Sequence, residues 1–509
     1  MRDRKAVRVP GPTGRASCDG KRVVVVGGGI AGLAAATVLA ERGAHVVLCE
    51  REDHLGGRVG GWETVLADGS RATMTRGFHA FFRQYYNLRS LLRRVDPTGD
   101  ALTAMPDYPL WHAGGHREGF AGLPRTAPWN ALGFLLRSPT FRPRDLTSVD
   151  ARAALPLLDV SVPRAYDELD ALDAADYLRR IRFPEAAHAL AFEVFSRSFF
   201  AHPSRMSAAE LATMFHIYFL GSNEGLLFDV AADPFPHSLW NPLARYLTGR
   251  GATVRTGTPV RRVSRVSRAS RGFTVELDDD ALAADAVVLA ADVNGLRALV
   301  EDSDLATPEW RADVKALDTA PPFLVSRYWL DRPVRRDRPG FLGTSGYDLL
   351  DNVTVLDAYE HEARAWAART GGAVVELHGY SLPDGVTGQE ARARLLAQLH
   401  EVYPETRAAR VVDERHELRA DCPLFPPGGW PTRPTVRTPE PGLVLAGDLV
   451  RVDLPVALME RAATTGFAAA NHLLSDWGVA GTDLWTVPTA GRGPVLRTLA
   501  RRFGRAPVA

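Results

Sequence analysis

The sequence is poor in cysteine and lysine and has almost no net charge. Its 509 residues include three cysteines, which form no C-x-x-C pair and no metal-ligand spacing. Disulfides and a structural metal are therefore not expected, and the absence of a C-x-H…C-x-x-H pair excludes an internal Rieske centre. The 61 basic and 60 acidic residues leave a formal charge of +1, which gives no electrostatic basis for nucleic-acid binding. Only three of the basic residues are lysine, a bias that we attribute to genome composition.

Long apolar runs are also missing. No stretch of about 18 apolar residues occurs, so no membrane-spanning helix is expected. Residues 1–20 are basic, rich in Pro and Gly and without the apolar run of a signal peptide, and we expect them to form a disordered tail. These absences favour a cytoplasmic protein. A chain with 46% hydrophobic and 24% charged residues can bury more than one core, so we expect two lobes.

Residues 21–50 contain the pattern of a dinucleotide-binding unit: a strand, a glycine turn, a helix, a second strand and an acidic residue. In the G-x-G-x-x-G turn, Gly27 permits the sharp bend, Gly29 lets the backbone approach a pyrophosphate and Gly32 lets the helix pack closely on the strand. The amides at the helix start then face the phosphates, and Glu50 is placed to bind a ribose hydroxyl.

Two further elements bear on which dinucleotide the chain binds. The G-G-R turn at residues 56–58 permits an anion-binding loop, in which Arg58 can neutralise phosphate through its forked donors. Much later, the segment G-L-V-L-A-G-D at 442–448 ends in Asp448, and an expected helix follows from residue 458. A helix start at this place would stabilise the negative charge of a reduced flavin.

These three elements, in this order, resemble the flavoproteins of the amine oxidase and phytoene desaturase superfamily. The resemblance implies FAD, with Asp448 at the ribityl chain, the backbone of Val260 at the adenine, and Gly77 in the turn that passes the isoalloxazine ring. No Cys or His stands in an attachment motif, so the FAD is expected to be non-covalent. The residues assigned to cofactor binding are Gly27, Gly29, Ala31, Gly32, Glu50, Arg51, Gly57, Arg58, Gly77, Val260, Gly447, Asp448 and Met459.

The same resemblance implies an α/β fold, with a Rossmann-like FAD-binding lobe of the GR2 type and an interleaved α+β substrate lobe. Alternating or continuous apolar residues predict strands at 252–255, 273–277, 286–291, 323–329 and 373–377. The expected divisions are an FAD-binding domain of residues 21–100, 240–304 and 415–475, a substrate domain of residues 101–239 and 305–414, and a basic C-terminal tail of residues 476–509.

Two motifs narrow the resemblance further. The segments R-G-F-H-A-F-F-R-Q-Y-Y-N-L at 76–88 and R-V-D-L-P-V-A-L-M-E-R-A at 451–462 are similar to those of the carotenoid-ring aromatases, the isorenieratene synthase-type β-carotene desaturase/methyltransferases. This resemblance implies an apolar carotenoid substrate, whose β-ionone ring loses four hydrogens while one geminal methyl group moves to the neighbouring carbon. The shift is intramolecular and needs no S-adenosylmethionine. An external electron acceptor is required, which the sequence does not identify.

Such a reaction also needs a dry pocket and a base, and the sequence offers two candidates for the base. His79 titrates in a useful range, although a histidine that only hydrogen-bonds the cofactor or the backbone fits the sequence equally well. Asp453 follows the Gly-Asp motif by five residues, with Arg451 as a neutralising neighbour. No Ser-His-Asp set or metal-ligand cluster competes with them, and no metal is expected.

Three apolar or amphipathic segments bear on the substrate and the membrane. The helix expected at 207–220 begins with S-A-A-E, the form of a capping box, and its aromatic face, extended by aromatic residues at 192–200, is either core or the wall of an apolar tunnel. The apolar cluster at 128–137 is too short to span a bilayer but could dip into its interface. The basic amphipathic stretch at 495–503 could also bind the interface, or it is a solvated tail. We therefore expect a peripheral protein at the inner face of the cell membrane.

Three alternatives are compatible with the same residues. One is a desaturase or isomerase of linear carotenes or another apolar terpenoid. A second is a flavin amine oxidase, which is disfavoured because the sequence places neither an aromatic cage nor a lysine beside the flavin. The third is a non-redox protein that holds FAD structurally or uses it without net turnover.

Overall fold

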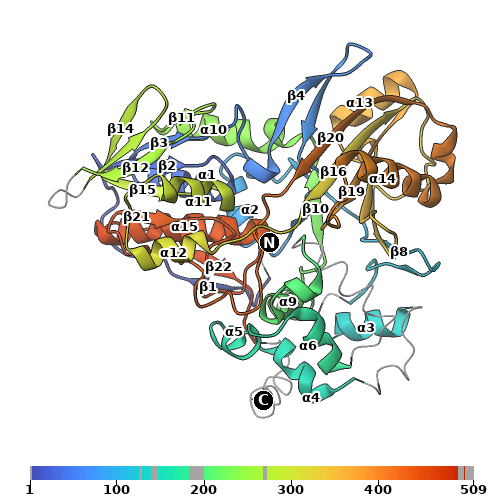
Figure 1. The fold of residues 1–509 in the computed structure, drawn as a ribbon, viewed down its shortest axis with the longest axis horizontal. Helices are drawn as coiled ribbons and strands as arrows, with labels where there is room; N and C mark the ends of the chain where they lie inside the picture. The colour runs from blue at the N-terminus through green and yellow to red at the C-terminus, as the bar shows by residue number, and fades with distance from the viewer. Residues whose placement is uncertain are drawn as a thin grey trace.

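The structure is a computed structural model that describes residues 3–124, 126, 129–138, 147, 149–182, 200–266, 272–490 and 498. Two large sheets lie in two lobes, and a group of short helices lies below them in the view of Figure 1.

The first lobe is built on a five-stranded parallel sheet. Its order is β11-β3-β2-β15-β21, and its strands come from three distant parts of the chain. The strands are β2 (Arg22–Val26), β3 (His45–Cys49), β11 (Thr253–Arg255), β15 (Ala286–Leu289) and β21 (Leu443–Leu445). Strands buried on both faces need continuous apolar residues, as in the valine run of β2.

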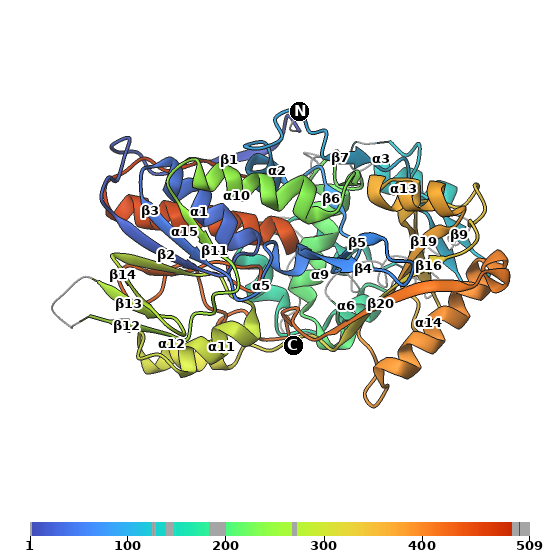
Figure 2. The same cartoon turned by 90° about the horizontal axis from the view of Figure 1, so that it is seen from above.

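The sheet lies between two layers of other elements (Figure 2). Its alternate side chains enter two different cores. Val23 and Val25 pack towards one group of helices, whereas Val24 and Val26 pack towards the opposite layer. The first group comprises α1 (Ile30–Glu41), α10 (Asn241–Thr248) and α15 (Leu458–Asp476). The opposite layer comprises α11 (Val293–Glu301), α12 (Pro308–Lys315) and a small antiparallel sheet of β12 (Arg262–Arg265), β13 (Phe273–Glu276) and β14 (Ala281–Ala284).

Helices α1 and α15 cross at very short range because of Gly466. A Cβ atom at this position would lie 2.3 Å from the carbonyl oxygen of Ala31. The close approach carries the start of α15 to the same edge of the sheet as the glycine turn that precedes α1.

The second lobe contains a seven-stranded sheet of order β20-β16-β19-β18-β17-β8-β9. Its strands are β8 (Leu110–His112), β9 (Arg117–Glu118), β16 (Phe323–Leu330), β17 (Phe341–Ser345), β18 (Asn352–Val355), β19 (Ala373–Gly379) and β20 (Val411–Arg419). On β19, Val375 and Leu377 pack in the core with α14 (Gly388–Val402), whereas Val374 packs in the opposite core with α13 (His361–Thr370). Because successive side chains of a strand point to opposite faces of the sheet, Glu376 and His378 lie on the same face as Val374.

The helical part contains α3 (Trp129–Arg137), α4 (Ala151–Ala154), α5 (Arg164–Leu169), α6 (Ala174–Ile181) and α9 (Ala208–Phe215). Ser207 caps α9 by accepting the N–H of Ala209, but the expected capping box is wrong. The backbone N–H of Ser207 donates to Phe425, and Glu210 instead forms buried ion pairs. Of the aromatic residues expected at 192–200, only Phe200 lies within the described residues.

The five strands predicted from apolar patterns are confirmed as β11, β13, β15, β16 and β19. The expected disorder of residues 1–20 is wrong for the described part. Strand β1 (Val7–Val9) pairs antiparallel with β22 (Leu484–Thr486), so residues 476–490 are not a free tail either. Arg8 adds an ion pair with Asp483, and Cys18 is buried in the core. The basic stretch at 495–503 lies outside the described residues except for Thr498.

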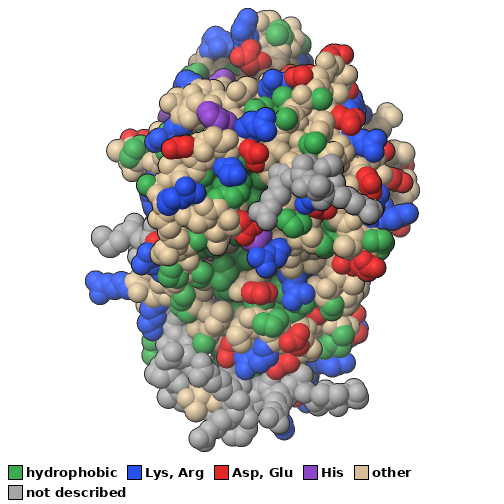
Figure 3. Space-filling model, turned by 90° about the vertical axis from the view of Figure 1, so that its left-hand side faces the viewer, with side chains coloured by type: hydrophobic (Ala, Val, Ile, Leu, Met, Phe, Trp, Pro, Cys, Tyr) green, Lys and Arg blue, Asp and Glu red, His purple; other side chains and the backbone are tan. Residues whose placement is uncertain are grey.

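Two further observations concern the surface. On the side of the molecule seen in Figure 3, basic and acidic side chains are interspersed, as the charge balance leads one to expect. Among the described residues, no helix has the length and apolarity needed to cross a bilayer.

Candidate active site

A cavity of about 540 Å³ lies between the carboxyl end of the parallel sheet and the face of the seven-stranded sheet that carries His378. Its size falls in the range of small-molecule and cofactor sites. Of the predicted cofactor residues, those that line it are Gly27, Gly29, Ala31, Glu50, Arg51, Gly57, Arg58, Val260, Gly447, Asp448 and Met459. Gly32 and Gly77 are buried beside it instead.

The three glycines of the first turn meet different demands. Cβ atoms at Gly27 and Gly32 would lie 2.5 Å from the carbonyl oxygen of Ala290 and 1.9 Å from that of Gly27, so the fold itself requires both glycines. At Gly29 the nearest atom to a Cβ is 3.9 Å away, on Gly57. The absence of a side chain at Gly29 therefore serves whatever enters the cavity, as a pyrophosphate does in this turn.

The second glycine turn is tied directly to the first. The N–H of Gly56 donates to the carbonyl of Gly28 at 2.9 Å, and Gly56 has a left-handed φ of 102°. Trp240 holds the turn from α10's side by donating its indole N–H to the carbonyl of Val59 at 2.6 Å. Two backbone turns thus face one space, which suits an anion that both contact.

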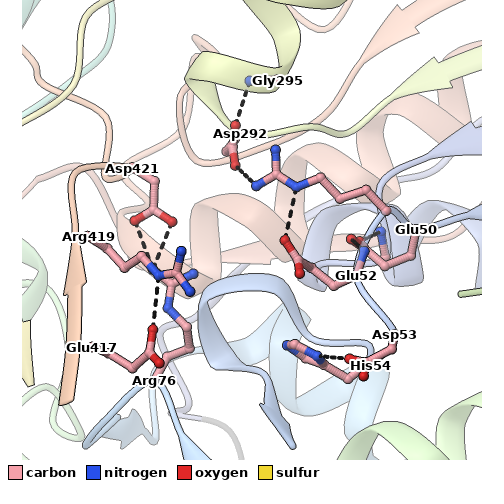
Figure 4. Close-up of polar contacts among 12 residues, drawn as sticks. Glu50, Glu52, Asp53, His54, Arg76, Asp292, Gly295, Glu417, Arg419 and Asp421 are labelled. Atoms are coloured by element: carbon pink, nitrogen blue, oxygen red, sulfur yellow. Dashed lines mark hydrogen bonds and ion pairs between the residues drawn. The ribbon is translucent and has the colours of Figure 1, made fainter. Parts of the chain in front are cut away.

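Acidic and basic side chains follow β3 at the outer end of the cavity (Figure 4). Glu50 accepts the N–H groups of Gly28 at 2.6 Å and Glu52 at 2.9 Å, so its carboxylate is fixed at the mouth of the first turn. Arg51 pairs with Asp292 at 2.9 Å and with Glu52 at 3.2 Å. The arrangement is suited to the ribose end of a dinucleotide.

The C-terminal elements close the cavity at its centre. Arg58 donates to Asp448 at 2.5 Å, which joins the second glycine turn to the G-D motif. Burial opposes the charge of Arg58, but Asp448 outweighs it and the pKa of the guanidinium is raised. Gly447 donates its N–H to Thr465 at 2.9 Å, and Met459 in the first turn of α15 lines the cavity. The positive end of α15 therefore points at the site.

Gly77 has a conformational task. Its φ is 99°, and a Cβ atom would lie 2.6 Å from the ring of His378. The turn allows the next residues, Phe78 and His79, to line the cavity. Arg76, at the start of this turn, pairs with Asp421 at 2.7 Å (Figure 4).

The structure separates the two predicted bases. His79 lines the cavity, and its Nδ1 lies 2.9 Å from the carbonyl oxygen of Gly77, which leaves Nε2 as the acceptor of the ring. Burial lowers the pKa of His79 to about 4. Asp453 is exposed and does not line the cavity, so its assignment as the base is wrong. Arg451 stacks on Trp430, with its guanidinium 4.6 Å from the ring centre.

Sequence reasoning missed the far end of the cavity, which is aromatic and polar. Phe78 stacks on Phe341 with ring centres 4.2 Å apart, and Phe228 and Tyr108 complete an aromatic cluster around them. The sequence did not show that these four aromatic residues meet. Beside it, β19 and the residue after it carry Glu376, His378 and Tyr380 at alternate positions. Their spacing of two residues along a predicted strand was the signal in the sequence that could have placed these three side chains on one face.

Comparisons with known proteins agree with this geometry. The model of the "Flavin containing amine oxidoreductase" family matches residues 30–474. The chain is 61% identical to "Carotenoid phi-ring synthase" of Streptomyces griseus, over 98% of this chain and 97% of that protein. It is 28% identical to the protein of the same name from Chlorobaculum tepidum, over 92% and 91% of the two chains. Among solved structures, a putrescine oxidase bound to putrescine matches with a TM-score of 0.66 at 18% identity, covering 89% of this chain and 99% of that one, and shows the same fold.

Proposed function

The chain belongs to the flavin-containing amine oxidoreductase family, and we propose that this oxidoreductase aromatises the β-ionone ring of a carotene. The proposed reaction removes four hydrogens from the ring and moves one geminal methyl group to the neighbouring carbon. The observation that carries the proposal is the 61% identity to the Streptomyces griseus phi-ring synthase along nearly the whole of both chains. Identity at this level and coverage favours a shared substrate class over the amines of the more distant fold relatives.

The residues of the cavity fit FAD. The two glycine turns suit its pyrophosphate, Glu50 its ribose and Asp448 its ribityl chain, and the lack of a side chain at Gly29 lets the pyrophosphate approach the backbone. When bound, oxidised FAD supplies a two-electron acceptor for the carotene ring. The positive end of α15 favours the negative charge of the reduced cofactor.

The far end of the cavity supplies what an apolar ring needs. Phe78, Phe228 and Phe341 form walls without hydrogen-bonding groups, so they bind a hydrocarbon ring and exclude water from a cationic intermediate. The polar groups of this end then act on the proton that the ring must lose.

We also propose that α3 contacts the membrane from which the carotene comes. Three apolar side chains at helical spacing stand outside the core: Trp129 is 60% exposed, Leu132 41% and Leu136 72%. Arg137 ends the helix, as in interfacial segments with a basic edge. The protein then lies at the inner face of the cell membrane without crossing it.

The direct test is incubation of the purified yellow protein with β-carotene in vesicles, with an artificial electron acceptor and analysis of the pigments by chromatography and mass spectrometry. We expect a product lighter by four hydrogens per converted ring, and flavin that acid releases from the protein. A product of unchanged mass would support an isomerase instead. Conversion of linear carotenes but not β-carotene would support a desaturase of linear substrates.

A further inference from the structure

A hydrogen-bonded chain of three side chains leads from the aromatic end of the cavity into the seven-stranded sheet. The hydroxyl oxygen of Tyr380 lies 2.7 Å from Nδ1 of His378, and Nε2 of His378 lies 2.9 Å from Oε1 of Glu376. Tyr380 and His378 line the cavity, whereas Glu376 is fully buried behind them. The alternation of β19 places all three on one face.

The ion pair behind this chain determines where its protons lie. Arg327 donates to Oε2 of Glu376 from two nitrogens, at 2.9 and 2.7 Å. Burial acts to raise the pKa of Glu376, but Arg327 and His378 outweigh it and lower this pKa to about 2. The carboxylate is therefore charged, and the nitrogen next to it, Nε2 of His378, carries a proton.

A neutral imidazole with a proton on Nε2 has its lone pair on Nδ1. Nδ1 then accepts the hydroxyl proton of Tyr380. The N–H of Phe78 also points at Nε2, at 3.2 Å, and would donate to it in the other tautomer. The relay assigns the proton to Nε2 because the contact of Nε2 with the charged Glu376 is the shorter one, at 2.9 Å. The amide of Asn352 donates to the Tyr380 oxygen at 3.0 Å, which leaves this oxygen a further lone pair.

We propose that Tyr380, His378 and Glu376 form a proton relay that deprotonates the carotene ring after the methyl shift, an assignment that rests on the proposed ring aromatisation. In this step, a ring C–H of the cation loses its proton to the Tyr380 oxygen, and the electron pair of that bond becomes a ring double bond. The hydroxyl proton of Tyr380 passes at the same time to Nδ1 of His378. The product is a neutral ring and an imidazolium paired with Glu376. Bound FAD would supply the acceptor for the two electrons removed earlier from the ring.

The protonation of Tyr380 and the hydrogen-bond partner of His378 favour this relay over His79 as the base. Burial raises the pKa of Tyr380 well above its usual value, so the phenol remains neutral and can act only by passing its own proton on. His378 can receive that proton because Glu376 stabilises the imidazolium, the arrangement by which a buried carboxylate supports a catalytic histidine. His79 has a backbone carbonyl rather than a carboxylate as its hydrogen-bond partner. An imidazolium at His79 is thus less stable.

The test compares Tyr380→Phe with wild type in two half-reactions. Reduction of the bound flavin by β-carotene without oxygen precedes the proton loss, and we expect its rate to stay within about threefold of wild type. Formation of the aromatic ring should fall by about 10²–10⁴-fold, the usual contribution of a positioned proton acceptor. Ring-deuterated β-carotene should then show a primary isotope effect on product formation in the variant. His378→Gln should give the same separation.

The matched control is Tyr403→Phe, which removes a buried hydroxyl that has no hydrogen-bond partner among the described residues, at a position that does not line the cavity. It should convert β-carotene as wild type does. A readout without turnover is ¹⁵N NMR of histidine in the FAD-free protein, where the Nδ1 signal that His378→Gln removes should shift in Tyr380→Phe.

Each other outcome overturns the relay. Normal aromatisation by Tyr380→Phe would exclude it, and loss of bound FAD would assign Tyr380 to cofactor binding. Equal slowing of flavin reduction and ring formation would assign Tyr380 to substrate placement. A wild-type protein that reduces no flavin with β-carotene and forms no aromatic ring would instead refute the proposed function on which the relay depends.

Discussion

At the scale of single residues, the cavity contains positions set by the fold and positions set by the ligand. Gly27 and Gly32 belong to the first kind because a Cβ atom would overlap neighbouring backbone. Gly29 belongs to the second kind. The G-x-G-x-x-G spacing predicted all three positions, but only the contacts separate a requirement of the fold from a requirement of the cofactor.

This distinction predicts different effects of two substitutions. Gly29→Val should leave the FAD-free protein folded, with a thermal unfolding temperature near that of wild type, because the new side chain enters open space. It should weaken FAD binding by at least about tenfold, or about 1.4 kcal/mol, since the side chain takes the place of the pyrophosphate. Titration of the FAD-free protein with FAD measures the loss.

Gly27→Ala is the contrasting variant, in which the unfolding temperature should fall even without FAD. Its φ of 107° and the 2.5 Å approach to Ala290 both oppose a side chain. Unchanged FAD affinity in Gly29→Val would refute the placement of the pyrophosphate.

At the scale of elements, the sequence predicted those helices and strands that can be recognised from the apolar pattern of their own residues. The run at 286–291 corresponds to β15 because strands buried on both faces need continuous apolar residues. The short pairing of β1 with β22 was not predictable, since each strand has three residues and their partners are far apart in the chain. Asp453 was misplaced for a related reason: five residues after a motif do not determine which way a loop turns.

Helix α3 carries the prediction that belongs to this scale. Replacing Trp129 and Leu136 with Asp should reduce sedimentation of the protein with liposomes by at least about tenfold, because each change removes apolar surface from the bilayer interface and adds a charge there. FAD content should not change, since neither residue lines the cavity.

Val65→Asp is the matched control for α3. Val65 is 62% exposed, but it lies on β4 (Gly61–Val65), at the end of the molecule opposite α3 in Figure 1. Liposome binding equally reduced in both proteins, or in neither, would exclude α3 as the membrane contact.

At the scale of the whole molecule, the helical part and the FAD-binding lobe are joined by a buried ionic cluster. Glu210 on α9 contacts Arg433 at 2.5 Å and Arg461 on α15 at 2.8 Å, and all three side chains are almost fully buried. Burial acts to raise the pKa of Glu210, but the two arginines outweigh it and lower this pKa to about 2. Sequence reasoning assigned Glu210 to a capping box because local spacing does not show distant arginines.

Glu210→Gln should therefore destabilise the protein by about 3–5 kcal/mol at neutral pH, since two buried guanidinium groups lose their counter-charge. In wild type, the lowered pKa means that the stabilisation is complete above the ordinary carboxyl pKa of about 4.3 and is lost as the pH falls towards 2. The difference between wild type and variant should shrink over the same pH range. Denaturant unfolding at several pH values measures both effects.

Asp278→Asn provides the comparison, because Asp278 forms an exposed ion pair with Arg261. Exposed pairs contribute little to stability, so this variant should unfold much as wild type does. If Glu210→Gln behaved like Asp278→Asn, the cluster would not join the two parts energetically.

The pairing of β1 with β22 has a consequence for synthesis on the ribosome. Arg8 and Asp483, which form an ion pair beside these strands, are separated by 475 positions. At about 5–20 residues per second, the first strand waits roughly 25–95 s for its partner to be made. During that interval its backbone donors and acceptors are open to chaperones or to another nascent chain. The pairing of β1 with β22 thus closes only after the strands of both large sheets have been synthesised.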